Sequence, residues 1–332
     1  MRRAAALSIL LAAMALPAPA LAVERVETPA PAPAAPPAQP PAPQSPFALT
    51  FERVGGERAT ALVGQRIRVR GASAEFVPGE TVTVRFLRSG REVRAEQVTL
   101  LPGAQGGGAF RLSYRPDRSG PLVVHASHAA TPALGELSAT SGEVDVLPRS
   151  VGPRSARSAV GALQRRLAQM GYVVGRRGAY DARTARAVLA FRKVTGMART
   201  FRASRGVMKA IARGAGRFKI RRPGHGRHIE ADLSRQVLAL VEGAAVRRIY
   251  PISSGKRGTP TVIGSFRVYL KRFGTNAIGM VHSAYFTGGY ATHGYPSVPA
   301  YPASHGCLRV PLREALSLFR WIRIGTPIDV YR

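Results

Sequence analysis

The sequence predicts a multidomain protein that consists of a β-sandwich, a small all-α domain and a β-rich C-terminal domain. Its 332 residues leave room for two or three domains of ordinary size. Apolar residues alternate with a period of two in the first half of the chain, and they recur at helical spacing in the segment that follows. Residues 23–46 are rich in proline and alanine, cannot bury a core and are expected to form an extended linker.

Residues 1–22 have the pattern of a signal peptide. Arg2 and Arg3 precede a short apolar run, and Ala20-Leu21-Ala22 is a small-x-small cleavage site. An uncleaved anchor is the alternative, but the run is shorter than the roughly 20 apolar residues of a membrane-spanning helix. We therefore expect a secreted protein, periplasmic or associated with the cell wall, that has no stable membrane span.

Residues 47–148 are expected to form an antiparallel β-sandwich of the immunoglobulin-like type. Period-two alternation marks several strands, and Gly and Pro residues separate them: 66–70, 81–86, 109–114 and 122–126. His125 and His128 could share one face, but a metal site needs a third ligand, so we expect surface or core histidines. No catalytic group is predicted in this domain.

Residues 155–214 are expected to form three helices. Apolar residues from Val160 to Met170 recur at helical spacing, and Gly171 ends this first helix. Asp181 stands where the N-cap of a second helix should be, and a third, short helix is expected around Val207.

Charge indicates an anionic partner. Lys and Arg number 49 against 18 acidic residues, and residues 150–214 alone hold thirteen Arg and two Lys against one acid. Such density suits an anionic surface such as a cell-wall polymer. Nucleic acid is not expected as a partner, because the chain has an export signal and no recognised nucleic-acid module.

The chain has a single cysteine, Cys307. One thiol excludes an internal disulfide framework, a Cys-rich zinc site and an iron–sulfur cluster, and we expect no metal or cofactor. The alternative of a buried, inert cysteine is the common one for a lone thiol. An exported protein that keeps an unpaired thiol risks oxidation, however, so retention for reactivity is favoured.

The surroundings of Cys307 suit a nucleophile. Residues 226–332 begin with strand-like segments at 236–241 and 247–253, and Cys307 ends the run Ser304-His305-Gly306-Cys307, with His293 upstream. An imidazole can take the proton of the thiol and then stabilise the thiolate. A tight Gly-containing turn lets successive backbone N–H groups point at an oxygen that becomes negative.

Two segments resemble known families. Residues 155–214 resemble the three-helix peptidoglycan-binding domain of secreted wall enzymes, although a small bundle with no binding role is the alternative. The C-terminal domain resembles the L,D-transpeptidase catalytic domain of the YkuD type. Four ordered motifs carry that second resemblance: Gly258-Thr259-Pro260-Thr261-x-x-Gly264-x-Phe266, Thr292-His293-Gly294, Ser304-His305-Gly306-Cys307-Leu308-Arg309 and Gly325-Thr326-Pro327-Ile328-Asp329-Val330.

The second resemblance implies a reaction and the roles of individual residues. Cys307 would attack a peptidoglycan tetrapeptide stem and release D-Ala, and the thioester would pass to an amine, giving a 3→3 crosslink, or to water. His293 would be the general base, oriented by the backbone carbonyl of Gly294. Backbone N–H groups of His305, Gly306 and Cys307 would form the oxyanion hole. Peptidoglycan stem peptides and glycan would be the partners.

Several assignments stay open at the level of sequence. His305 competes with His293 for the role of base. Arg309 is expected to bind a substrate carboxylate or to form a salt bridge in the wall of the site. Ser304 is expected to contact substrate or to support the turn. Tyr290 belongs to an aromatic, Gly-containing run that is either a lid over substrate or a packed hairpin.

The segment between His293 and Ser304 is shorter than is usual in the family, and Arg309 stands where the family often has Asn. The first departure puts acceptor specificity in question, and the second affects substrate contact. A wall-binding protein with an inert catalytic domain is the rival function, which release of D-Ala would exclude.

Overall fold

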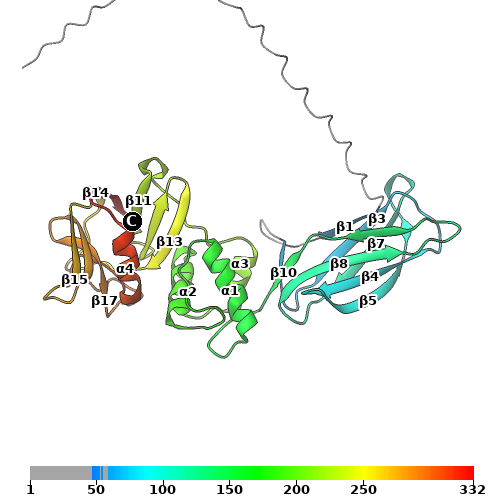
Figure 1. The fold of residues 1–332 in the computed structure, drawn as a ribbon, viewed down its shortest axis with the longest axis horizontal. Helices are drawn as coiled ribbons and strands as arrows, with labels where there is room; N and C mark the ends of the chain where they lie inside the picture. Colours follow the sequence, from blue (N-terminus) through cyan, green and yellow to red (C-terminus); the bar gives the residue numbers. More distant parts are fainter. Residues whose placement is uncertain (1–46, 53, 55–58) are drawn as a thin grey trace, which may run out of the picture. The chain divides into compact units, whose positions relative to one another are not determined.

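A computed structural model describes residues 47–52, 54 and 59–332 of the chain. The predicted signal peptide and linker lie outside the described residues. Within them the protein is multidomain and mostly β, with four α-helices (Figure 1). None of these helices has the length and hydropathy of a membrane span.

The first domain contains two β-sheets that share one apolar core. One sheet has the strand order β1-β3-β7-β6, and the other has the order β2-β10-β8-β4-β5, with β9 paired to β8. Inward residues of both sheets, such as Val69 and Phe110 from one and Val84 and Val124 from the other, belong to the same buried cluster. The strands are β1 (Phe47–Glu52), β2 (Thr60–Leu62), β3 (Ile67–Ser73), β4 (Thr81–Arg88), β5 (Arg91–Thr99), β6 (Leu101–Pro102), β7 (Gly108–Tyr114), β8 (Gly120–His128), β9 (Leu137–Thr140) and β10 (Val144–Leu147).

The two histidines of β8 do not share a face. Alternate residues of a strand point to opposite sides, and His125 and His128 are three positions apart. His128 is buried and its Nδ1 lies 2.9 Å from the carbonyl oxygen of Thr81, whereas His125 Nε2 lies 3.3 Å from Ser138 Oγ. Across residues 47–52, 54 and 59–332 there is no group of three or more His, Cys, Asp or Glu that could hold a metal ion.

Three helices follow, as their sequence patterns predict: α1 (Arg157–Gln169), α2 (Ala182–Val194) and α3 (Arg205–Ala212). Asp181 caps α2, because its carboxylate accepts a hydrogen bond of 2.8 Å from the backbone N–H of Thr184. Gly171 follows the end of α1 with φ of +91°, a conformation that costs glycine little. The buried faces of the helices share a core with Val237 and Ile249 of the next domain.

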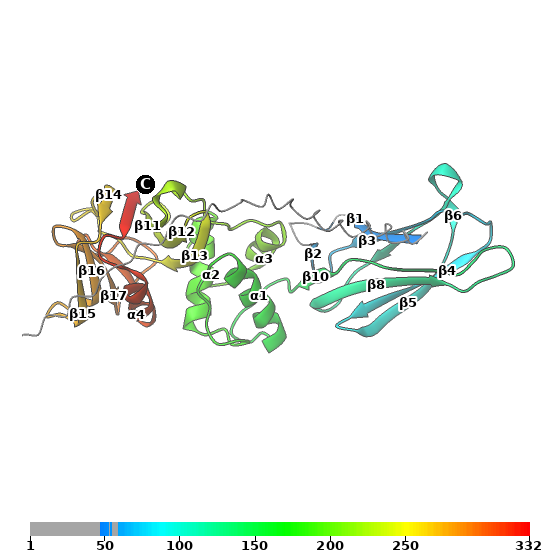
Figure 2. The same ribbon diagram turned by 45° about the horizontal axis from the view of Figure 1, so that its top comes forward.

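The C-terminal domain has two sheets and one helix (Figures 1 and 2). Its five-stranded sheet has the order β13-β12-β11-β19-β14, and its four-stranded sheet has the order β15-β16-β17-β18. Helix α4 packs on β16 and β17, and Figure 2 shows it beside them. The elements are β11 (Arg227–Asp232), β12 (Val237–Glu242), β13 (Ala245–Pro251), β14 (Gly264–Arg267), β15 (Leu270–Thr275), β16 (Val281–Thr287), β17 (Tyr290–Tyr295), β18 (Leu308–Pro311), α4 (Leu312–Trp321) and β19 (Pro327–Tyr331).

Candidate active site

The pairing of β17 with β18 brings Cys307 to His293. The two strands are parallel, with His293 opposite Arg309 and Thr292 opposite Leu308. Cys307, directly before β18, is therefore level with Ala291, two residues before His293 on the neighbouring strand. Because residues two apart on a strand face the same side, this register directs the side chains of Cys307 and His293 to one face of the sheet.

The backbone of β17 orients the imidazole of His293. The ring is 3% exposed, and its Nδ1 lies 2.9 Å from the carbonyl oxygen of Gly294. A carbonyl oxygen only accepts, so Nδ1 carries the proton and Nε2 keeps its lone pair. Helix α4 packs tightly here: a Cβ on Gly294 would lie 2.5 Å from the Cβ of Ala315, and glycine is required at this contact.

Burial shifts the pKa values of the two side chains in opposite directions. Burial raises the pKa of Cys307, against the opposing effects of the Ala291 backbone N–H and the charge of Arg309. Burial also lowers the pKa of His293; the Gly294 carbonyl opposes this shift and Arg309 adds to it. The charge of Arg309 acts on both groups, which places both near one guanidinium.

These directions favour a thiol beside a neutral imidazole at rest. The sequence-based expectation of a thiolate held by an imidazolium is therefore not what the resting geometry favours. A neutral imidazole can still act as a general base, because it accepts the thiol proton as the sulfur attacks. Cys307 itself is partly exposed, and its Sγ lies 3.6 Å from the carbonyl oxygen of Gly289.

Ser304 holds the turn that carries Cys307. It is 1% exposed, accepts a hydrogen bond of 3.0 Å from the Gly306 N–H and donates one of 2.6 Å to the Cys307 carbonyl oxygen. Both bonds lie within the turn, which gives Ser304 a supporting position in this structure. The N–H of Gly306 is thus engaged, in contrast to the expectation that it points at a substrate oxygen, and the amides of His305 and Cys307 are the remaining candidates.

Gly306 is also required by its conformation and its neighbour. Its φ is +121°, and a Cβ there would lie 2.6 Å from Cε1 of Tyr290. The aromatic run that contains Tyr290 forms the β16–β17 hairpin, and its ring packs partly buried against the core of the domain. Of the two alternatives for this run, the packed hairpin is what the structure contains.

The Gly-Thr-Pro-Thr motif supports the same turn. Thr261 Oγ1 donates to the Gly306 carbonyl oxygen at 2.6 Å, and Thr259 Oγ1 donates to that of Ser304 at 3.0 Å. Thr261 is buried, and its hydroxyl also accepts from the N–H of Gly255 at 2.9 Å. The two motifs, 45 residues apart, thus form one hydrogen-bonded unit.

Arg309 and His305 have different surroundings. The Arg309 guanidinium lies 4.1 Å from the centre of the Tyr295 ring, and that ring packs edge-on against His293. Among the residues that the structure describes, no carboxylate forms a salt bridge with Arg309, which leaves its charge available to a ligand. His305 is exposed, with its Nε2 3.5 Å from Lys256 Nζ.

The sequence did not reveal the surroundings of the thiol completely. Gly289, Ala291 and Tyr295 contact the site through backbone or ring, and none of them carries a chemical signature. Only their positions in the sequence could have indicated them: the Gly288-Gly289 pair predicts a turn, and Tyr295 follows His293 by two residues on the same strand face.

Residues 226–330 match the family model of the L,D-transpeptidase catalytic domain, YkuD. The C-terminal part of the chain is therefore an L,D-transpeptidase catalytic domain, and the match spans all four motifs of the site. The comparison with curated proteins found no match.

Similar solved structures include other L,D-transpeptidases. One is the L,D-transpeptidase from Xylanimonas cellulosilytica, at 36% identity over 55% of this chain and 95% of that one, with a TM-score of 0.48. Another is the catalytic domain of an Enterococcus faecium L,D-transpeptidase, at 28% identity over 32% of this chain and 98% of that one, with a TM-score of 0.29. A structure of that catalytic domain acylated by ertapenem is similar at 28% identity over 32% of this chain and 97% of that one, with a TM-score of 0.28.

Proposed function

We propose that this protein is a peptidoglycan L,D-transpeptidase that forms 3→3 crosslinks through an acyl-enzyme on Cys307. The observation that carries the proposal is the parallel pairing of β17 and β18, which directs Cys307 and the oriented imidazole of His293 to one face. The pairing supplies a nucleophile, a base and an orienting carbonyl within one sheet. No metal or cofactor takes part in the proposed steps.

The first half of the reaction forms a thioester. His293 Nε2 takes the proton of Cys307 as Sγ attacks the carbonyl carbon that joins the third stem residue to D-Ala. The N–H groups of His305 and Cys307 donate to the oxygen that becomes negative. When the tetrahedral intermediate collapses, the imidazolium of His293 protonates the leaving nitrogen, and free D-Ala departs.

The second half resolves the thioester. A side-chain amine of a neighbouring stem attacks the same carbonyl, gives its proton to His293 and forms the crosslink, while Cys307 recovers its proton. Attack by water instead gives a shortened stem and carboxypeptidase activity. Arg309, charged and without a carboxylate partner among the described residues, is placed to attract a carboxylate of the substrate.

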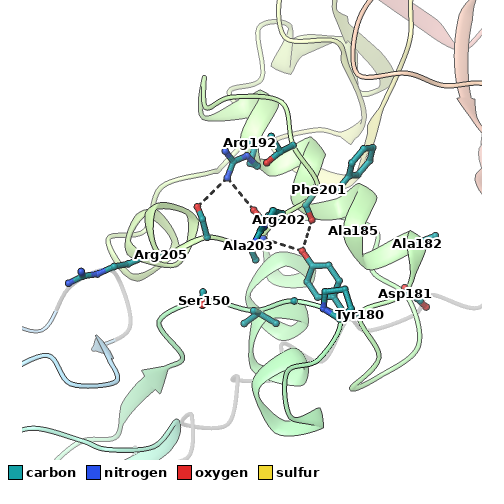
Figure 3. Close-up of a pocket in the computed structure, with 15 residues that line it drawn as sticks. Ser150, Tyr180, Asp181, Ala182, Ala185, Arg192, Phe201, Arg202, Ala203 and Arg205 are labelled. Carbon is teal, nitrogen blue, oxygen red and sulfur yellow. Dashed lines mark hydrogen bonds between the residues drawn. The ribbon is translucent and has the colours of Figure 1, made fainter.

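We also propose that the helical segment binds peptidoglycan, which is the finer part of the family resemblance. A cavity of about 910 Å³ lies there, and Tyr180, Phe201 and the exposed Arg202 and Arg205 help to line it (Figure 3). Two of its lining residues are linked, because the Tyr180 hydroxyl donates to the Phe201 carbonyl oxygen at 2.6 Å. Aromatic rings beside cations suit a sugar chain that bears carboxylates. We also propose that the protein works in the periplasm or the cell wall, where this substrate lies.

The test uses the purified chain and tetrapeptide-containing muropeptides. We expect release of D-Ala and crosslinked products by mass spectrometry, and one covalent adduct per chain after incubation with a carbapenem. Cys307→Ala should abolish both. An adduct that persists in this variant would show that the nucleophile is wrongly assigned. If the wild-type chain binds sacculi yet releases no D-Ala, the inert wall-binding protein is the better description.

A further inference from the structure

One lysine of the helical segment is buried in the catalytic domain. Lys193, near the end of α2, is 2% exposed, and its Nζ donates to the carbonyl oxygens of Gln236 and Ile252, each at 3.0 Å. In the described part of the chain no carboxylate pairs with it. A buried ammonium without an acidic partner is costly, so its two acceptors must lie where they do for the domain to form.

Gln236 links Lys193 to the segment directly after β13. Its carbonyl oxygen also accepts from the N–H of Ile252 at 3.0 Å. Its side chain holds Ser254 twice: Nε2 donates to Ser254 Oγ at 2.6 Å, and Oε1 accepts from the Ser254 N–H at 3.0 Å. Gln236 has a φ of +58°, an unusual conformation for a residue with a side chain, which this network maintains.

Ser254 forms hydrogen bonds with the start of the turn that carries Cys307. Its carbonyl oxygen accepts from the N–H groups of Ala303 and Ser304, both at 2.9 Å. Residue 253 pairs with Arg309 on the other side of the thiol, through two hydrogen bonds between Ser253 and Arg309 of 3.0 and 3.1 Å. An unbroken series of hydrogen bonds therefore runs from Lys193 through Gln236 and Ser254 to Ser304; we name this series the Lys193 path.

A second contact from the same segment reaches the loop before the turn. Arg199 donates to the carbonyl oxygens of Ala300 and Ser234, at 3.1 and 2.7 Å. Arg235 of the catalytic domain donates in return to the carbonyl oxygens of Lys193 and Val194 at the end of α2. The helical segment thus touches the backbone on the approach to Ser304.

We infer that Lys193 is a positioning residue, through which the helical segment sets the placement of Cys307. The inference rests on the proposed function and goes beyond it, because it gives the helical segment a part in acylation in addition to wall binding. Deleting the amino group removes one support of the 252–254 backbone and, through that backbone, one support of the turn that carries Ser304. A misplacement of about 1 Å can cost about 100-fold in rate.

The test uses Cys307, the single cysteine of the chain, as its own reporter. Intact mass spectrometry follows the rate of alkylation by iodoacetamide across pH, which needs no substrate, and a separate assay measures kcat and KM for D-Ala release. We compare Lys193→Met, Gln236→Met and the double variant; Gln236→Met keeps the size of the side chain and removes both of its hydrogen bonds to Ser254. Lys209→Met is the matched control, because it removes an exposed lysine from α3 of the same segment.

Lys193→Met and Gln236→Met should each change the alkylation rate by about fivefold in the same direction, as the exposure and ionisation of the thiol change. Each should lower kcat by about tenfold with KM little altered. The double variant should equal the stronger single variant, because the two substitutions interrupt one path. The Lys209→Met control should stay within about twofold of wild type.

Unchanged alkylation in folded Lys193→Met, or effects that add in the double variant, would overturn the inference. Where Lys193→Met does not fold by circular dichroism, Gln236→Met alone decides, and an unaltered rate of thiol alkylation in that variant again overturns the inference. A wild-type chain that releases no D-Ala would refute the proposed function instead. The alkylation rates would still test the Lys193 path, because they need no substrate.

Discussion

Two buried histidines of the catalytic domain have opposite surroundings. His228 on β11 is fully buried and uses both ring nitrogens: Nδ1 lies 3.0 Å from the Gly226 carbonyl oxygen, and Nε2 lies 3.3 Å from Oε1 of Glu230. His293 on β17 is nearly as buried but uses only Nδ1, and no partner for its Nε2 is seen in the described residues. Burial alone therefore does not mark a reactive histidine; the unused nitrogen does.

The carboxylate beside His228 explains the difference. Glu230 is fully buried and accepts hydrogen bonds from the N–H groups of Arg221 and Arg222 and, at 2.7 Å, from the Tyr331 hydroxyl. A group so fully partnered stabilises the sheet and has nothing to offer a substrate. The carbonyl that orients His293 fixes the ring without occupying its second nitrogen.

The largest effect should come from the histidine with the free nitrogen. We expect His293→Asn to lower kcat/KM for D-Ala release by about 1,000-fold, because the thiol loses its base. His305→Asn, which alters the exposed competitor, should cost less than about tenfold. Steady-state kinetics at neutral pH measure both, and an equal loss in the two variants would contradict the assignment of His293.

Substitution in the hydrogen-bonded cluster of His228, Glu230 and Tyr331 should lower the stability of the fold and leave the rate of acylation unchanged. Glu230→Gln weakens the hydrogen bonds to His228 and Tyr331 and should lower the free energy of unfolding by about 3 kcal/mol. Urea denaturation measures the loss. Carbapenem labelling of the folded fraction should keep the wild-type rate; a slower rate per folded molecule would show that this cluster also serves the site.

Lys193 provides a third buried group, with carbonyl partners only. Burial lowers its pKa to about 7, and the charge of Arg199 adds to the shift. An unfolded lysine keeps its proton to about pH 10, so between these values the unfolded chain binds more protons and the free energy of unfolding rises with pH. Most of this rise, on the order of 2 kcal/mol, should vanish in Lys193→Met, as urea titrations at pH 6.5 and 9.5 would reveal.

The smallest effect concerns the turn. Ser304→Ala removes the acceptor of the Gly306 N–H and the donor to the Cys307 carbonyl, and acylation should slow by about tenfold. Ser304→Thr, which keeps the hydroxyl, should recover part of the rate. Pre-steady-state labelling by mass spectrometry separates the acylation step, and a wild-type rate in the alanine variant would show that the other contacts suffice.

The sequence predicted the regular elements and the chemical groups better than their contacts. Period-two alternation located β4 and β8, and Asp181 located the start of α2, because these signals are local. Cys307 could be singled out because it is the only thiol. The engagement of the Gly306 N–H could not be foreseen, since the Ser304 hydroxyl competes for it only once the turn has closed.

Lys193 escaped sequence analysis for a different reason. A lysine in a helix predicts an exposed face, and its partners are 43 and 59 residues further along the chain. Only the packing of α2 against β13 turns that position inward. The directions in which the pKa values of His293 and Cys307 shift could not be predicted from the sequence either, because they follow from burial and from the charge of Arg309 next to the site.

The hydrogen bonds between β17 and β18 have a consequence for how such enzymes can diversify. They set the spacing of nucleophile and base through the sheet, and the stretch from Pro296 to Ala303, which connects the two strands, is held by backbone hydrogen bonds at Ala300, Tyr301 and Ala303. Side chains in this stretch, such as the exposed Tyr301, can therefore change while the backbone contacts keep the reacting atoms in place.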